Sequence, residues 1–137
     1  GTLVDDLWKF DGSDWKQLRD IANNDSDEDY DDDYAITRAG TVSFVIDGRG
    51  YIATGTRSGV TSDYWVYDPE EDLWYGDSDD DYTPMTNVHN VSSGGSSRSY
   101  AVSFSTGKRG FVLSGSSGTS YFDDVYELLP YEQEDVD

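Results

Sequence analysis

Two acidic segments contain carboxylates at alternating positions, a spacing that suits a metal ion. The alternating residues are Asp25, Asp27 and Asp29 in one segment and Asp77, Asp79 and Asp81 in the other. Loops that surround Ca²⁺ use oxygen ligands at every second residue in this way. An EF-hand loop starting at Asp77 is excluded, because Tyr82 and Val88 stand where that loop needs glycine and glutamate. Two alternatives remain: weak calcium binding, or solvated acidic loops that keep the chain soluble.

Groups that could perform catalysis are scarce. The chain has no cysteine, which excludes disulfides, thiolate metal ligands and cysteine nucleophiles. Its one histidine, His89, fits a solvated loop better than a metal site. The serines between Ser92 and Ser97 lie in a Gly/Ser-rich segment with no general base at a recognisable spacing. The sequence therefore predicts no cofactor and no catalytic constellation.

The charge of the chain limits its partners. There are 29 acidic and 9 basic residues, for a formal net charge of −20. Phosphate backbones and anionic lipid surfaces are repelled by such a chain, so we expect no nucleic-acid partner. No apolar run approaches the roughly 18 to 20 residues of a membrane span, so we expect no membrane insertion.

An internal repeat organises the elements that position these residues. The segment 38–44 matches 98–104, and the segment 50–55 matches 110–115, both at an offset of sixty residues without a gap. Asp63 and Asp123 match at the same offset. A partial upstream copy, 6–11, aligns with 63–68. Repeats of this period indicate stacked supersecondary units.

Each repeat is predicted to be a four-stranded antiparallel sheet. In the central copy the strands are 41–46, 51–54, 64–67 and 73–75, short runs rich in β-branched and aromatic residues. Asp47 and Gly48 form a hairpin turn, because both tolerate positive φ. The predicted fold class is all-β.

The residues Gly50, Tyr51 and Gly55, the run 63–69 and Trp74 resemble the Kelch-repeat family, most closely the exported Kelch proteins of Bacteroidetes-type bacteria. The resemblance implies a partial Kelch-type β-propeller made of four-stranded antiparallel blades. One departure is that the family's double glycine is single here, at Gly55 and Gly115.

The expected organisation is one propeller segment over 1–137. Residues 1–22 form the second half of a blade, 38–76 a complete blade and 98–130 the first three strands of a blade; 23–37 and 77–97 are acidic or polar inter-blade loops, and 131–137 is an acidic tail. The chain is then a fragment of a longer propeller, a subunit of a ring of copies, or an open stack. Incomplete blade edges would favour self-association.

Arg38 and Arg98 occupy equivalent repeat positions at the start of the innermost strand. In a propeller, that position is near one mouth of the central channel. The resemblance to Kelch-type sialic-acid mutarotases implies that such arginines could bind a carboxylate. The alternative is structural, an arginine that pairs with an acidic loop or binds backbone carbonyls.

The predicted function is a non-catalytic binding or scaffold module of an exported protein, periplasmic or on the bacterial cell surface. Its loops would contact a protein or a glycan. The alternative is a carbohydrate-modifying enzyme, such as a sugar-acid mutarotase or epimerase, that uses Arg38 and Arg98. The family that the chain resembles includes both binding modules and enzymes, so the fold alone does not decide between these two functions.

Overall fold

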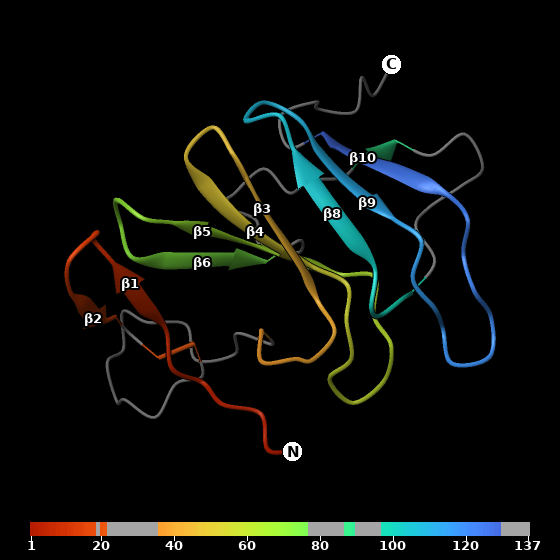
Figure 1. The fold of residues 1–137 in the computed structure, drawn as a ribbon, viewed down its shortest axis with the longest axis horizontal. Coiled ribbons are helices and arrows are strands. Elements are labelled where there is room, and N and C mark those ends of the chain that lie inside the picture. The colour runs from red at the N-terminus through yellow and green to blue at the C-terminus, as the bar shows by residue number, and fades with distance from the viewer. Residues whose placement is uncertain (19, 22–35, 77–86, 90–96, 130–137) are drawn as a thin grey trace. The chain divides into compact units, whose positions relative to one another are not determined.

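A computed structural model of the protein describes residues 1–18, 20–21, 36–76, 87–89 and 97–129. Within these ranges the chain is all-β, with ten strands in three antiparallel sheets and no helix, as the sequence predicts (Figure 1). None of the described residues therefore belongs to a helix that could cross a membrane. The chain divides into two compact units, 1–38 and 39–137.

The first unit contains a two-stranded hairpin, β1 (Trp8–Phe10) paired with β2 (Trp15–Gln17). Its turn is closed by Asp11, whose carboxylate accepts hydrogen bonds from the backbone N–H groups of Ser13 and Asp14. Such side-chain-to-backbone bonds are the reason aspartate favours turns. Because successive side chains of a strand point to opposite sides, the hairpin has two faces formed by alternate residues.

The second unit begins with sheet 1, a meander of β3 (Val42–Ile46), β4 (Arg49–Ala53), β5 (Tyr64–Asp68) and β6 (Leu73–Gly76) in that spatial order. These are the four strands expected for the central repeat. Asp47 and Gly48 both have positive φ, 49° and 79°, which matches the right-handed twist of a two-residue hairpin.

Sheet 2 contains β8 (Val102–Ser105), β9 (Gly110–Leu113) and β10 (Val125–Leu129), and its fourth strand is β7 (Asn87–His89). The expectation that 77–97 is only an inter-blade loop is therefore wrong, because His89 pairs with Glu127 in the ladder. A three-residue strand is too short to show a period of two. What makes it a strand is the exposed hydrogen-bonding edge of β10.

The strands of the two sheets pair in the same way, but the sequence offset between equivalent residues increases by one after β9. Thr54 N–H donates to the Asp63 carbonyl in sheet 1, and Ser114 N–H donates to the Asp124 carbonyl in sheet 2. Asp124, and not Asp123, is therefore the structural equivalent of Asp63. The expected gapless offset is wrong beyond β9, because the following loop contains one extra residue and surface loops absorb such insertions.

The core of the second unit lies between its two sheets. We call the side of a sheet that bears Phe44, or its equivalent Phe104, the forward face, and the side that bears Gly50, or its equivalent Gly110, the rear face. The forward face of sheet 1 packs on the rear face of sheet 2 in one hydrophobic cluster, whose buried members are Val42, Phe44, Ile46, Tyr51, Ala53, Tyr64, Val66, Val112, Tyr126 and Leu128. The sheets do not close into a ring.

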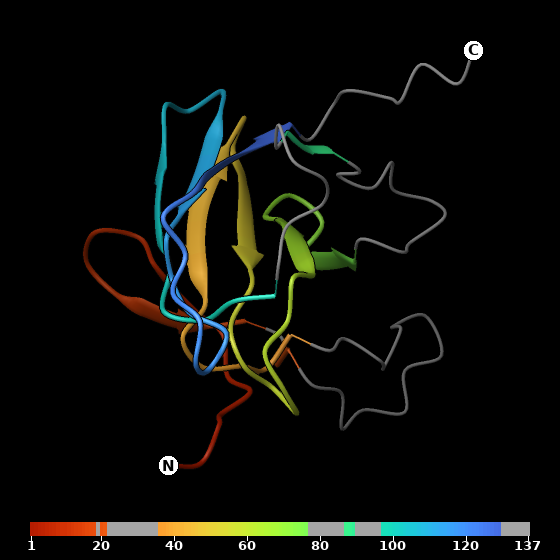
Figure 2. The same ribbon diagram turned by 90° about the vertical axis from the view of Figure 1, so that its right-hand side faces the viewer.

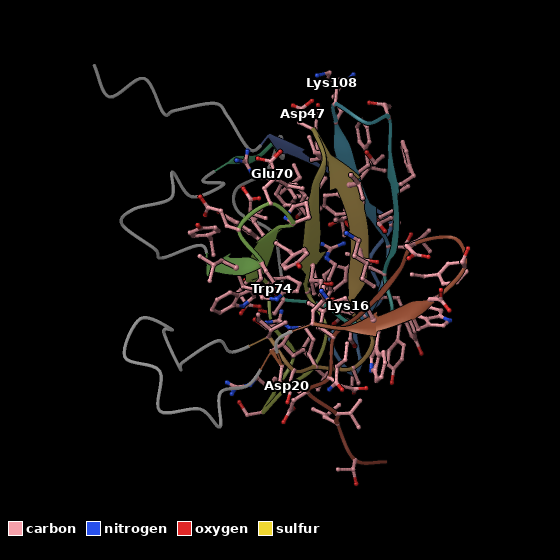
Figure 3. All side chains as sticks on the ribbon, turned by 90° about the vertical axis from the view of Figure 1, so that its left-hand side faces the viewer. Lys16, Asp20, Asp47, Glu70, Trp74 and Lys108 are labelled. Carbon is pink, nitrogen blue, oxygen red and sulfur yellow. The ribbon has the colours of Figure 1, made fainter. Side chains whose placement is uncertain are left out.

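The inner strands β3 and β8 run side by side (Figures 1 and 2), joined by a parallel bridge between Ile46 and Gly107. The Ser103 hydroxyl donates to the Ser43 carbonyl at 2.9 Å. At one end of the sheets the Lys108 ammonium pairs with Asp47 (Figure 3). These polar contacts align the two strands along the same direction.

Candidate functional site

Among the described residues of the second unit, Arg98 is the most completely buried charged side chain. Only 1% of its surface is exposed. Its Nη1 and Nη2 atoms donate to the two carboxylate oxygens of Asp124, at 2.5 and 3.0 Å, and Nη1 also donates to the Ser114 carbonyl at 2.7 Å. The bidentate arrangement uses the planar fork of the guanidinium, which matches a carboxylate.

Aromatic rings complete this enclosure. The guanidinium carbon lies 4.4 Å from the Phe122 ring centroid and 4.6 Å from that of Tyr126. Hydrogen bonding to Arg98 holds the pKa of the Asp124 carboxyl below its ordinary value of 3.8, against the opposing effect of partial burial. The electrostatics of the site therefore favour an ionised pair inside the protein.

The backbone of Arg98 also links the sheets. Its N–H donates to the Thr61 carbonyl at 3.1 Å, and its carbonyl accepts from Gly55 N–H at 2.7 Å. The backbone and the guanidinium of Arg98 thus both make hydrogen bonds inside the second unit. This geometry supports the structural alternative for Arg98, whose guanidinium pairs with Asp124, directly before β10, and binds a backbone carbonyl.

Arg38 falls in the first unit, at its end. It is half-buried, and its Nε donates to the Ile36 carbonyl at 2.8 Å. The two arginines predicted to form one ligand site thus lie in different units. The side chain of each arginine donates a hydrogen bond to a backbone carbonyl within its own unit, so both have a structural contact of this type.

The six alternating aspartates of the calcium hypothesis, at positions 25, 27, 29, 77, 79 and 81, lie outside the described residues. Among the residues that are described, no group of three or more His, Cys, Asp or Glu side chains is arranged to hold a metal ion. Weak calcium binding by the acidic segments stays a prediction.

The hairpin β1–β2 has an aromatic face that the repeat pattern did not reveal. Trp8 and Phe10 alternate on β1, and Trp15 stands directly opposite Phe10, so the three rings share one side. The Phe10 and Trp15 centroids are 5.0 Å apart, and all three side chains are exposed. We call these three residues the hairpin aromatic face.

Polar groups border this face. The Trp8 indole N–H donates to Asp6 Oδ2 at 2.6 Å, and Gln17, opposite Trp8, donates to Asp20 at 3.2 Å. Phe10 and Trp15 match the Tyr67 and Trp74 pair of sheet 1, whose centroids are also 5.0 Å apart. That match predicts core residues, which is why sequence reasoning missed an exposed surface.

No protein-family model matches the chain, and none of the curated proteins matches it.

Proposed function

We propose that the protein is a non-catalytic binding module, built from blades of a partial Kelch-type propeller and exported to the periplasm or cell surface. Its ligand is a glycan that stacks on the hairpin aromatic face. The observation that supports this most directly is the exposure of Trp8, Phe10 and Trp15 on one side of the hairpin. A large exposed aromatic surface marks an interaction site more often than an isolated exposed residue does.

The chemistry of the face suits a sugar. A pyranose ring has an apolar C–H face that can be removed from water against a flat aromatic side chain, and hydroxyls around its edge. The carboxylate of Asp6 and the amide of Gln17 lie beside the rings and can bind such hydroxyls. Acidic glycans are disfavoured by the net charge of −20, so we propose a neutral polysaccharide.

The alternative of a sugar-acid mutarotase or epimerase has less support. It requires Arg98 to bind the carboxylate of a substrate, whereas the guanidinium is buried against Asp124 and the Ser114 carbonyl. Releasing it would leave the partly buried Asp124 carboxylate without this counter-charge, which is costly. The arrangement therefore favours binding without turnover.

Affinity electrophoresis in gels containing neutral polysaccharides tests the proposal. The wild-type protein should be retarded by at least one of them, and Trp15→Ala should weaken that retardation at least about tenfold, as loss of a central aromatic contact does. Tyr121→Ala is the matched control, because Tyr121 is an exposed aromatic residue of the second unit.

Equal migration of the wild-type protein and Trp15→Ala in every gel would reject the glycan face. Steady release of a modified sugar by the purified protein would reject the non-catalytic function instead. The two results are separable, since one is a mobility and the other a chemical product.

A further inference from the structure

Identical residues of the two repeats differ sharply in exposure. Val42 and Phe44, on the forward face of sheet 1, are 4% and 7% exposed. Their equivalents on sheet 2, Val102 and Phe104, are 63% and 49% exposed. The forward face of sheet 2 is therefore an apolar surface of core composition that nothing among the described residues covers.

The protein itself shows what covers such a face. The Phe44 ring lies over Gly110 on the rear face of sheet 2. A Cβ atom at Gly110 would stand 2.4 Å from Phe44 Cε2 and 3.0 Å from Ile46 Cδ1. The forward face of a sheet thus requires a partner sheet whose second strand has a glycine at this position.

The rear face of sheet 1 has that glycine without a ring over it. Gly50 is the repeat equivalent of Gly110, and a Cβ atom there would meet only Tyr67 Cβ, at 3.7 Å, among the described residues. Ser43 and Val45, on the same face of the neighbouring strand β3, are exposed. Within the part of the second unit that the structure describes, Phe104 on one sheet and the complementary Gly50 on the other are therefore both uncovered.

We propose that a second copy of this chain covers the forward face of sheet 2, with its own sheet 1, in a head-to-tail contact. Phe104 packs over Gly50 of the second copy as Phe44 packs over Gly110. The Ser43 hydroxyl of the second copy donates to the Ser103 carbonyl, in the way that the Ser103 hydroxyl donates to the Ser43 carbonyl within one chain. Since the two surfaces differ, the contact propagates into a short chain or closes into a ring.

Charge sets the conditions for this association. Each copy has a net charge of −20, so two copies repel at low ionic strength. The forward face of sheet 2 also bears the Arg109–Glu127 ion pair, with the Arg109 guanidinium carbon 5.1 Å from the Phe111 centroid. This pair is internally neutral, so it adds no repulsion. We expect weak association that strengthens at about 1 M salt, where the screening length falls to about 3 Å.

Sedimentation velocity of the full chain tests the proposal, from about 10 µM to about 1 mM, the range in which small interfaces associate. At high salt the wild-type sedimentation coefficient should rise with concentration. Gly50→Val should remove that rise. Valine suits a strand, and the position has room for its Cβ atom, so this variant should fold, and its thermal midpoint measures any cost of the two γ-methyl groups.

A second variant provides a mixing test. Phe104→Ser should also sediment as a monomer, because it lacks the ring, while it keeps an unmodified Gly50. An equal mixture of Gly50→Val and Phe104→Ser then contains one intact surface of each kind. It should form a dimer and nothing larger.

Three results would overturn the proposal. They are a wild-type protein that stays monomeric at every concentration and salt, a Gly50→Val variant that associates like the wild type, and a mixture in which no dimer forms. The association lies in the second unit, so these results are independent of glycan binding by the hairpin aromatic face.

Discussion

The ion pair between Arg98 and Asp124 offers the sharpest test of how the second unit is stabilised. Asp124→Asn keeps the shape of the side chain and removes its charge. The Arg98 guanidinium, 1% exposed, then faces an amide nitrogen in place of one carboxylate oxygen. The buried cation loses this counter-charge.

Removing one partner from a buried ion pair costs about 3–5 kcal/mol. The Asp124 side chain is 31% exposed, so water partly compensates. We therefore expect Asp124→Asn to lower the free energy of unfolding by about 2–3 kcal/mol at pH 7. Because whole domains are stable by only about 5–15 kcal/mol, a loss of this size is readily measured.

Urea unfolding followed by tryptophan fluorescence measures these free energies for a double-mutant cycle. Its members are the wild type, Asp124→Asn, Arg98→Met and the double variant. Methionine keeps an apolar stem between the Phe122 and Tyr126 rings. We expect the two substitutions to couple by about 1–3 kcal/mol, so that Asp124→Asn costs little once the guanidinium is absent.

The same pair predicts a dependence on pH. The pKa of Asp124 is lowered in the folded protein, chiefly by its hydrogen bond to Arg98. The contribution of the pair is therefore fully present above the ordinary carboxyl value of 3.8 and is lost as pH falls through the lower folded value. The stability difference between wild type and Asp124→Asn should be constant near neutrality and shrink below pH 4.

A coupling energy under about 0.5 kcal/mol, within the error of additive sites, would refute this account. Should Asp124→Asn fail to fold, the comparison of Arg98→Met with the double variant still decides. A large further loss in the double variant would show that Asp124 acts through some other group.

Two further predictions test the sheet interface and the acidic segments. Gly110→Ala should lower the free energy of unfolding by about 1–3 kcal/mol, because its Cβ atom would collide with the Phe44 ring. Gly50→Ala, measured in the same urea assay, should leave the free energy of unfolding unchanged. Equal effects of the two substitutions would contradict the packing of Phe44 on Gly110. If the aspartates at 25–29 and 77–81 bind Ca²⁺ in the folded state, a hundredfold excess over Kd should stabilise the protein by about 2.7 kcal/mol, and a melting curve unmoved by Ca²⁺ would reject the calcium site.

The strands that alternate clearly were predictable from the sequence. β3, β4, β5 and β6 lie where short β-branched and aromatic runs end at turn residues. Asp47 and Gly48 also adopt the positive φ that their types favour. These features depend on neighbours within a few residues, so the local sequence contains them.

The parts that depend on distant neighbours were not predictable in this way. β7 is a strand because β10 has an edge to pair with, and β10 lies about forty residues further along the chain, beyond the reach of any local pattern. The pairing of Arg98 with Asp124 was hidden by an insertion, which placed Asp123 at the expected offset. The aromatic face of β1–β2 resembles core residues in type, and only its surroundings expose it.

Burial in this protein is a property of neighbours more than of residue types. The tripeptide Val-Ser-Phe occurs at 42–44 and again at 102–104, with the same strand conformation and the same alternation. Its apolar side chains are covered in the first copy and open in the second. Removing apolar surface from water is favourable in proportion to its area. Covering the exposed Val102 and Phe104 would therefore still release free energy, as covering Val42 and Phe44 already has. The residues at 42–44 are covered by a rear face that contains Gly110, and sheet 1 has a second rear face, which contains Gly50. A neighbouring chain therefore offers Phe104 a surface of the kind that already covers Phe44.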